Sequence, residues 1–421
     1  MQNFKTVSFA DSNSGKSKVV SIGFTEKEDS LFLKIVKLSS QEIRRIISID
    51  SYERLCEAAG SDKRPISQFI KNELTKAIDN GAPFTVSDIT FRSSKSLPFQ
   101  RWYPYAEGYS PDFVTSIISK YINFDGVVYE PFAGTGTTIF ASDSMGYSTV
   151  YSEVNPVLQF LISVKLKVLA LSPEARLELS EEVLSLSKKL LAFDCEEDKS
   201  LRDNFTAVFR RSVYFCTESF SQILSAKTFI RQLNNDVAKD LITIAVLSSL
   251  IPSSYLKKQG DLRFKTKKEL ENGVPPFSAI FLDNVNLIID DLCNYKCLSI
   301  CKSHHFITSN AKNISDVELK EPISFVITSP PYLNGTNYIR NTKLELWFME
   351  QLSSEKDLRH FRDEILTSGI NDVKMCSYME DDIETISPLL KSTMAELKQY
   401  AYDIRIPQMV KSYFEEMYCF F

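Results

Sequence analysis

The sequence predicts an α/β fold built on a parallel sheet, and three observations support this. Asp125–Glu130 is a short apolar strand that runs into a glycine-containing turn and then into a helix ending near Met145. A second strand, Ser148–Glu153, follows this helix and ends in an acidic residue, which makes the segment one βαβ unit. Strand character returns at Phe306–Ser309 and at Ile323–Thr328.

The composition is that of a globular protein: of 421 residues, 43% are hydrophobic and 24% charged. These values exclude disorder, collagen and coiled coil. The eight cysteines are thinly spread, which favours reduced thiols over a disulfide framework. No apolar stretch reaches the length of a membrane span, so we expect a cytoplasmic protein without membrane contact. Because the net charge is −5, any nucleic acid must bind through local basic patches.

Four regions are expected along the chain. Residues 1–95 form an N-terminal α/β region of unknown role, and residues 96–156 carry the glycine turn. Residues 157–300 are helix-patterned with no alternating strand runs, which predicts a large helical insertion. Residues 301–421 carry the last strands and then helices.

Glycine is scarce in the chain but clustered in one place. Four of the thirteen glycines are Gly126, Gly134, Gly136 and Gly146, which indicates backbone positions where a side chain would not fit. A G-x-G turn between a strand and a helix directs backbone N–H groups and the positive helix end at a ligand. At the tip of the next strand, Glu153 is placed to accept both hydroxyls of a ribose.

The turn departs from the dinucleotide-binding fingerprint. Where that fingerprint has a third glycine or alanine, this chain has Ile139. The larger residue disfavours the close approach of a pyrophosphate, and hence NAD, but allows a nucleoside without phosphates. A tight turn without a ligand is the alternative interpretation of the glycines alone.

A serine, two prolines and a tyrosine follow the strand Ile323–Thr328. Pro330 and Pro331 fix the backbone and remove two N–H donors, so nearby carbonyls remain able to accept. Acceptors at the Ser329 hydroxyl and the Pro330 carbonyl would hold the two hydrogens of an exocyclic amine and aim its lone pair at a methyl donor. Tyr332 would stack on a base held outside its duplex. A proline-stiffened turn is the alternative interpretation.

Together these motifs resemble those of the amino-methylating DNA methyltransferases, which transfer a methyl group from S-adenosylmethionine to an exocyclic amine of cytosine or adenine. Glu130–Thr138 (EPFAGTGTT) is similar to the cofactor motif of that family, Glu153–Pro156 to the E-x-N-P that follows, and Thr328–Tyr332 (TSPPY) to the catalytic motif. Arg101–Pro111 is similar to the motif over the methionine end of the cofactor, and Leu333–Trp347 resembles the tail of one branch. The resemblance implies a Rossmann-like class I methyltransferase sheet of seven mostly parallel strands.

The resemblance also implies residue roles. The target base is expected to be presented and stacked by Ser329, Pro330, Pro331 and Tyr332, with no metal, by alignment of the reacting atoms. The expected cofactor-binding residues are Tyr103, Tyr109, Glu130, Pro131, Phe132, Gly134, Gly136, Thr137, Thr138, Glu153, Asn155 and Asn310. Asn310 occupies a place where the family usually has an aspartate near the adenine amine, and its amide oxygen is still able to accept.

A serine before Pro-Pro-Tyr favours, in this family, cytosine N4 over adenine N6. The stretch between Thr138 and Ser329 is long enough to hold a target-recognition region. The expected contacts with DNA phosphates are the basic residues Lys257, Lys258, Arg263, Lys265, Lys267 and Lys268. A solvated, charged helix-loop face is the alternative interpretation of this run.

After Tyr332 the sequence predicts only helices, so the sheet is expected to be incomplete at its C-terminal side. A second polypeptide that supplies the remaining strands is favoured over a truncated, inactive gene or a wrong assignment of the last helices. The expected function is a site-specific DNA methyltransferase of a restriction-modification or phage-defence system. The alternatives are a non-catalytic DNA-binding subunit or half of a split enzyme, and RNA and protein-glutamine methylation are minor rivals.

Three cysteines, Cys293, Cys297 and Cys301, recur at every fourth residue, with His304 and His305 just beyond. This spacing puts the thiols on one helical face, where cysteine is a small buried hydrophobe. Structural zinc sites favour tighter C-x2-C pairs, so no metal is expected.

Overall fold

The computed structural model describes residues 3–10, 17–24, 96–105, 108–122, 126–193, 196–295, 298, 300–311, 322–333, 338–370, 373 and 387–418. The chain divides into two compact units, Met1–Ile89 and Thr90–Phe421. In the first unit, β1 (Asn3–Ala10) and β2 (Ser17–Phe24) form an antiparallel hairpin that sequence analysis did not predict. The rest of the predicted N-terminal α/β region, up to residue 95, lies outside the described residues.

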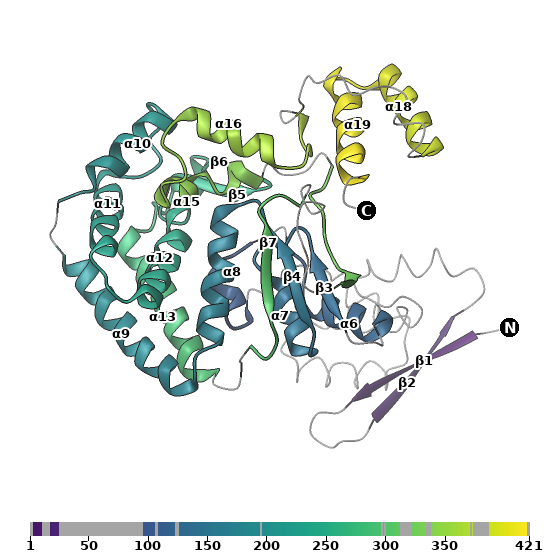
Figure 1. Cartoon of the computed structure of the whole chain (residues 1–421), viewed down its shortest axis with the longest axis horizontal. Helices are drawn as coiled ribbons and strands as arrows, with labels where there is room; N and C mark the ends of the chain where they lie inside the picture. The colour runs from purple at the N-terminus through teal and green to yellow at the C-terminus, as the bar shows by residue number, and fades with distance from the viewer. Residues whose placement is uncertain are drawn as a thin grey trace. The chain divides into compact units, whose positions relative to one another are not determined.

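The second unit contains a four-stranded sheet in the order β7-β4-β3-β8, in which all neighbouring strands are parallel (Figure 1). The strands are β3 (Val127–Glu130), β4 (Ser148–Ser152), β7 (His304–Thr308) and β8 (Ile323–Val326). The predicted α/β fold with a parallel sheet is therefore confirmed. Within the described residues the sheet has four strands, whereas the resemblance implied seven.

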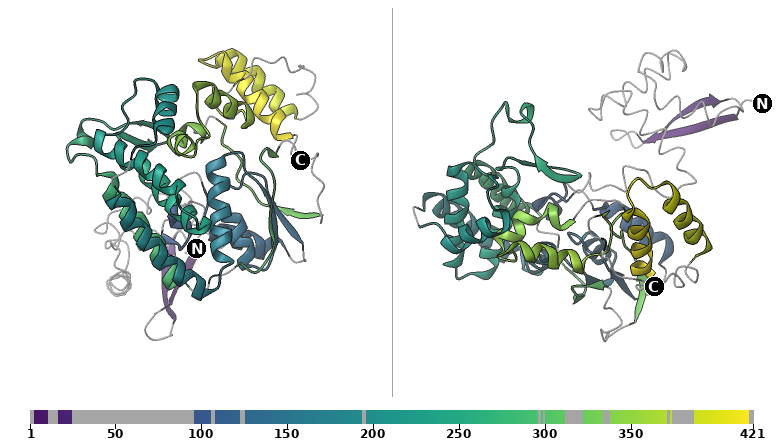
Figure 2. Two further views of the ribbon diagram at one scale, coloured as in Figure 1. Left: turned by 60° about the vertical axis from the view of Figure 1, so that its left-hand side comes forward. Right: turned by 90° about the horizontal axis from the view of Figure 1, so that it is seen from above.

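Helices flank this sheet and form a separate layer beside it (Figures 1 and 2). Before β4 the chain forms the short η2 (Gln100–Trp102), α6 (Pro111–Tyr121) and α7 (Thr137–Ser144). Between β4 and β7 it forms α8 (Pro156–Leu169), α9 (Pro173–Ala192), α10 (Lys199–Phe209), α11 (Thr217–Arg231), α12 (Asp236–Leu250), η3 (Lys268–Leu270) and α13 (Phe277–Asn294). After β8 the described elements are α14 (Tyr338–Asn341), α15 (Lys343–Phe348), α16 (Glu355–Glu364), α18 (Pro388–Tyr400) and α19 (Arg405–Tyr418).

Local sequence explains where several helices begin. Ser110, Asn155, Ser172 and Ser387 each precede a proline, and each side chain accepts a hydrogen bond from a backbone N–H of the first turn. The polar cap satisfies a donor that would otherwise lack a partner, and the proline begins the helix without losing a hydrogen bond. The cap at Asn155 also fixes the chain directly after β4, at the edge of the sheet where the site lies.

The two faces of the sheet pack against different groups of side chains. Val128 packs with apolar residues of α6 and α7, and Tyr151 packs with residues of α7 and α8. Val127, Tyr129 and Val150 point to the opposite face and form their own cluster. Both strands are therefore buried on both faces, although β4 (STVYS) also carries the small polar residues Ser148, Thr149 and Ser152.

The largest core fills the helical layer, where α9, α12 and α13 pack together and α12 also contacts α8 and α15. Trp347 of α15 is fully buried in this core, and its indole N–H donates to the Leu201 carbonyl oxygen at 2.9 Å. This contact ties the chain that follows β8 to the helical layer. Segments that follow the sheet strands therefore contribute side chains to the core of the helical layer.

The prediction that residues 157–300 contain no strand is wrong, because β5 (Leu256–Gln259) and β6 (Asp261–Phe264) form an antiparallel hairpin there. Leu256 and Leu262 are its buried residues, and Gly260 makes the turn with φ of 71°. With one buried apolar residue per strand, the alternation is too weak to detect among so many charged residues.

The predicted helical face of cysteines is also wrong. Helix α13 ends at Asn294, so the exposed Cys301 lies beyond it, while Cys293 is half-buried and Cys297 lies outside the described residues. Among the residues that the structure describes, no group of three His, Cys, Asp or Glu side chains is arranged to hold a metal. No helix in the described part of the chain is long and apolar enough to cross a membrane.

Candidate functional site

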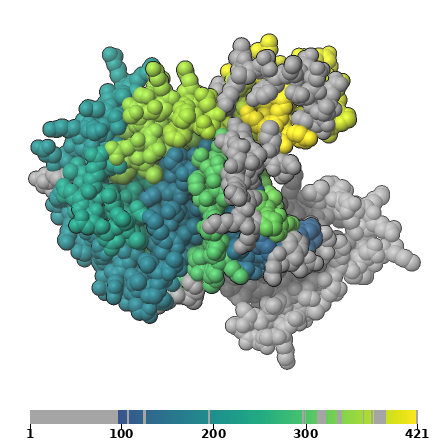
Figure 3. All heavy atoms as spheres, in the orientation of Figure 1, coloured from purple at the N-terminus to yellow at the C-terminus, as the bar shows by residue number. Residues whose placement is uncertain are grey.

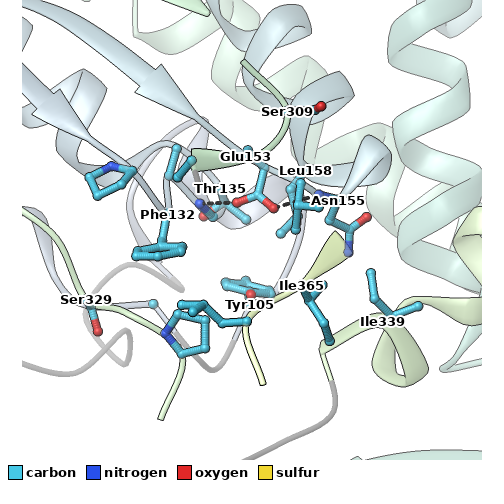
Figure 4. Close-up of a pocket in the computed structure, with 18 of the residues that line it drawn as sticks. Tyr105, Phe132, Thr135, Glu153, Asn155, Leu158, Ser309, Ser329, Ile339 and Ile365 are labelled. Carbon is cyan, nitrogen blue, oxygen red and sulfur yellow. Dashed lines mark hydrogen bonds between the residues drawn. The ribbon is translucent and has the colours of Figure 1, made fainter. Parts of the chain in front are cut away.

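A cleft opens where the parallel strands end. Residues that follow β3, β4, β7 and β8 line it, together with the loop before α6 and the segment after α16. In Figure 4, Glu153 lies near the middle of this cleft, with Ser329 to one side and Asn155 and Ile339 to the other. The carboxyl edge of a parallel sheet is where α/β proteins generally bind ligands.

The turn after β3 needs glycine at two positions. Gly134 and Gly136 have φ of 55° and 90°, in the left-handed region that residues with a Cβ rarely adopt. A Cβ on Gly136 would lie 2.8 Å from the Phe140 ring, and one on Gly134 would lie 3.3 Å from the Tyr105 ring. The turn therefore presents bare backbone to the cleft at Gly134, while Gly136 is required for packing.

The carboxylate of Glu153 is held from both sides by backbone. Its Oε2 accepts from the Gly134 N–H at 2.8 Å and its Oε1 from the Asn155 N–H at 2.8 Å (dashed in Figure 4). Burial raises the pKa of Glu153 to about 7, although these two hydrogen bonds oppose the rise. The orientation of this acidic group in the cleft is therefore fixed before any ligand binds.

Glu130 does not line the cleft, but its side chain forms hydrogen bonds with several segments that do. Its buried carboxylate accepts from the Phe132 N–H at 3.0 Å, the Thr138 hydroxyl at 2.6 Å and the Thr328 hydroxyl at 2.5 Å. The Tyr109 hydroxyl donates to it as well. Burial raises the pKa of Glu130, and the four donors counter this rise. One side chain thus connects the glycine turn, the loop before α6 and the end of β8.

The serine-proline segment after β8 meets the glycine turn in this cleft. Ser329 and Pro331 line it, whereas Pro330 does not. Tyr332, directly after Pro331, is 62% exposed and lies outside the lining. Its side chain is therefore accessible to solvent beside the cleft.

The loop before α6 is fixed by a buried acid on α13. The carboxylate of Asp291, fully buried, accepts from the Phe99 N–H at 2.7 Å, the Trp102 indole N–H at 2.8 Å and the Arg101 Nε at 2.9 Å. Tyr105, a few residues further on, lines the cleft. The helical layer thereby positions one wall of a cleft that is otherwise formed by strand ends.

The structure brings most of the predicted cofactor-binding residues together. Those that line the cleft are Tyr109, Pro131, Phe132, Gly134, Thr137, Glu153, Asn155 and Asn310. Those outside the lining are Tyr103, Glu130, Gly136 and Thr138. The Tyr103 hydroxyl instead donates to Glu345 Oε1 at 2.7 Å and accepts from Lys258 Nζ at 3.3 Å.

Several residues that line the cleft are not among the predicted ones. They are Tyr105, Gly108, Ala133, Thr135, Val154, Leu158, Ser309, Ala311, Ile339, Glu364, Ile365, Leu366 and Ser368. Most of these are neighbours in sequence of predicted residues, so the motifs point to them. Glu364, the last residue of α16, and the segment that follows it to Ser368 are different, because they lie far along the chain from any motif. No sequence signal marks this segment.

The predicted DNA-contacting residues lie on and beside the β5–β6 hairpin, but several are engaged within the protein. Lys257 and Arg263 both pair with Glu269, at 2.7 and 2.8 Å. Lys258 lies over the Tyr103 ring, 5.2 Å from its centroid. These three cations therefore present less charge to a ligand than the sequence indicates.

The remaining three basic residues differ in their surroundings. Lys265 donates to the Ser254 carbonyl oxygen at 2.6 Å, whereas Lys267 and Lys268 are exposed. The hairpin is attached to the helix beside the cleft, because Asn341 accepts from the Leu262 N–H and donates to a carbonyl of the turn, both at 2.9 Å. Asn341 ends α14, whose Ile339 lines the cleft.

The fold and the site define an α/β protein with a cleft at the carboxyl edge of its parallel sheet, and known proteins are similar to it in sequence. The type II methyltransferase M.AvaI of Nostoc sp. is 25% identical over 361 residues, which cover 79% of this chain and 72% of that protein. M.BsoBI of Geobacillus stearothermophilus is 22% identical over 359 residues, 78% of this chain and 67% of that protein.

A protein of the same name, M.AvaI, from Anabaena variabilis matches equally well. No family model and no solved structure matches the chain. The chain is a relative of the type II methyltransferases, which confirms the resemblance to DNA methyltransferases found in its motifs.

Proposed function

We propose that this chain is a site-specific DNA methyltransferase that transfers a methyl group from S-adenosylmethionine to an exocyclic amine, with cytosine N4 favoured over adenine N6. Relatives named as type II methyltransferases support methylation as one half of a restriction-modification system. The observation that carries the proposal is the shared cleft. Gly134 and Glu153 of the cofactor motifs and Ser329 and Pro331 of the catalytic motif line the same cavity, although they are far apart in sequence.

The residues present fit a nucleoside joined to an amino acid. The cleft is lined by both apolar and polar side chains, as sites for small organic ligands usually are. Glu153 faces it with an acid oriented by two backbone N–H groups, as acceptor for ribose hydroxyls. Gly134 offers a surface without a side chain to the methionine portion. Asn310, Tyr109 and Asn155 would complete the binding site.

S-adenosylmethionine supplies an electrophilic methyl group on a sulfonium. The chain would act by holding the accepting amine in line with it, because alignment of two reactants lowers the barrier without a covalent intermediate. The Ser329 hydroxyl and the Pro330 carbonyl would accept the two amine hydrogens, and Tyr332 would stack on the extruded base. The serine at position 329 is the basis for favouring cytosine.

DNA would lie over the exposed Tyr332 and the β5–β6 hairpin. Asn341 of α14 forms hydrogen bonds with the hairpin. The position of phosphate contacts made by the hairpin would therefore be fixed relative to the cleft. We assign target recognition to region 157–300, which contains this hairpin, and the methyltransferase core to regions 96–156 and 301–421. Lys267 and Lys268 are the strongest candidates for phosphate contacts, since they are exposed.

Two measurements test the proposal together. Calorimetry with S-adenosylmethionine reports cofactor binding, and tritium-methyl transfer to unmethylated DNA reports catalysis. Ser329→Ala is expected to bind the cofactor normally and to lose transfer, while the matched control Ser392→Ala on the exposed face of α18 retains both. Normal transfer by Ser329→Ala would contradict the assigned role.

The same measurements decide between the alternatives. Cofactor binding without transfer by the purified chain, restored by adding the product of a neighbouring gene, would support the predicted second polypeptide. Cofactor binding without transfer under any addition would support a non-catalytic DNA-binding subunit. The methylated base is identified by mass spectrometry of digested product DNA, in which N4-methylcytosine is the expected product.

A further inference from the structure

Two polar side chains meet at the end of the cleft next to β7. Asn310 follows β7, and Glu364 is the last residue of α16. The Asn310 amide Nδ2 donates to Glu364 Oε2 at 3.1 Å and to the Glu364 carbonyl oxygen at 3.2 Å. Both residues line the cleft. Only the asparagine is predicted from the sequence to have a role in this cleft.

The strand order decides which part of a bound nucleoside would reach this pair. The order β7-β4-β3-β8 places the glycine turn after β3, Glu153 after β4 and Asn310 after β7 along one edge of the sheet. A ligand with its amino-acid portion at Gly134 and its ribose at Glu153 therefore extends its base toward β7. Ala311 and Leu366, both nearly fully buried, line the cleft close in sequence to the pair and provide apolar surface for a ring.

We propose that Glu364 reads the base of the cofactor by accepting a hydrogen bond from the exocyclic amine of adenine, and that Asn310 positions Glu364 for this contact. The proposal rests on the proposed function, because it concerns the same cleft. An ionised carboxylate only accepts hydrogen bonds, and it has positions for a second donor beside the Asn310 amide. It would therefore favour an amine at this position of the purine and repel a carbonyl oxygen.

The segment that carries Glu364 is held in place from the far end of the chain. The Thr367 N–H donates to Glu416 Oε2 at 2.9 Å, and the Thr367 hydroxyl donates to Glu416 Oε1 at 2.8 Å. Both residues are buried, and Glu416 belongs to α19. Helix α16 itself contacts α10 and α14, and it lies beside the teal helical layer in Figure 3. These contacts support the precise placement that recognition of a single amine requires.

The test compares two ligands that differ at this amine and at the adjoining ring nitrogen N1, which accepts hydrogen bonds in adenine and donates one in hypoxanthine. S-inosylhomocysteine carries a carbonyl oxygen where S-adenosylhomocysteine carries the amine. We expect the wild-type protein to bind the adenosyl ligand ~10- to 100-fold more tightly, because a charged acceptor gains a donor in one case and faces an acceptor in the other. Glu364→Gln, whose amide both donates and accepts, is expected to reduce this preference about tenfold.

Glu355→Gln, at the other end of α16, is the matched control, since its carboxylate pairs with Arg210 at the surface. It is expected to keep the wild-type preference. Equal affinities of the wild-type protein for the two ligands would overturn the proposal without need of any variant. A Glu364→Gln protein that weakens both ligands equally would also overturn it, because the residue would then shape the cleft without reading the amine. Failure of the wild-type protein to bind S-adenosylhomocysteine at all would instead contradict the proposed function.

Discussion

The Thr328 hydroxyl donates a hydrogen bond of 2.5 Å to Glu130, which joins the end of β8 to the end of β3. Glu130 also accepts from Phe132 and Thr138 of the glycine turn. Thr328 directly precedes Ser329, so the proposed catalytic segment and the proposed cofactor turn share one buried carboxylate. Their relative position is set by the fold and does not depend on a ligand.

Replacement of Thr328 by valine is expected to slow methyl transfer more than it weakens cofactor binding. Valine keeps the shape of the side chain but removes the donor, which leaves the Glu130 carboxylate with one fewer partner in a buried place. We expect a cost of ~1–2 kcal/mol in the free energy of unfolding, transfer reduced at least tenfold, and a cofactor Kd changed less than threefold. Thr243→Val in α12 is the control, and its hydroxyl bonds only to its own helix. Equal losses in Kd and in transfer would show that the bond serves the turn alone.

Cofactor binding is expected to weaken as the pH falls through about 7. The pKa of Glu153 is raised to about 7 by burial, so the carboxyl becomes protonated below that pH and loses acceptor capacity for ribose hydroxyls. Affinity should fall by up to about tenfold per pH unit below this point. Calorimetry at pH values from about 6 to about 8.5 would compare the cofactor affinity of the wild type with that of Glu153→Gln. Because the ligand titrates identically in both, parallel profiles would rule out Glu153 as the titrating group.

The buried lysine on α8 should make stability rise with pH. Lys165 is fully buried, and its ammonium donates to the Thr135 carbonyl oxygen of the glycine turn at 3.0 Å. Burial lowers its pKa from 10.5 to about 7. Between these values the unfolded chain binds a proton that the folded protein does not, so the free energy of unfolding increases with pH, by up to ~1.4 kcal/mol per unit.

Lys165→Met is expected to remove this slope. Urea unfolding at several pH values between 7 and 10 measures the slope, because these values lie between the pKa of about 7 in the folded protein and the ordinary lysine pKa of 10.5. Lys167→Met, whose lysine is half exposed and pairs with Asp240, should keep the wild-type slope. An unchanged slope in Lys165→Met would mean that another group titrates in this range.

The exposed lysines after the hairpin should carry more of the DNA affinity than the paired ones. A double Lys267→Ala, Lys268→Ala variant is expected to reduce the slope of log K against log salt by about 2, since each lost phosphate contact contributes ~0.9. Lys257→Ala should change the slope less, because that lysine already pairs with Glu269. Fluorescence anisotropy with labelled duplex at several salt concentrations gives both slopes. If Lys257→Ala reduces the slope more than the double variant does, the hairpin contacts DNA through the side that carries Lys257 and not through Lys267 and Lys268.

The sequence predicts the strands of the sheet well, for a physical reason. β3 and β4 are buried on both faces and carry β-branched or aromatic residues such as Val128 and Tyr151. Each strand is followed by residues with strong local requirements, such as Gly134 and the Asn155-Pro156 helix start. The arrangement of Glu153 and Ser329 in one cleft also follows, because parallel strands end at the same edge of a sheet. What is local in sequence, or imposed by sheet topology, is predictable.

Contacts between distant segments are not predictable in this way. The tie of Glu130 to Thr328 and the support of Thr367 by Glu416 depend on three-dimensional packing that no periodicity records. The basic run looks like one positive patch because the sequence does not show that Glu269 pairs with both Lys257 and Arg263 and offsets part of their charge. Tyr103 stands in a recognisable aromatic loop, yet its hydroxyl bonds to Glu345 away from the cleft.

The hydrogen bonds from Thr367 to Glu416 have a practical consequence for anyone shortening this protein to obtain crystals. Deleting α19 would remove Glu416 and leave two buried donors of Thr367 without their acceptor, a few residues from the cleft. The parallel sheet of such a shortened protein would remain intact, but the segment around Thr367 that lines one side of the cleft would be held less firmly. Ligand soaks into those crystals would then underestimate the selectivity of the full-length chain.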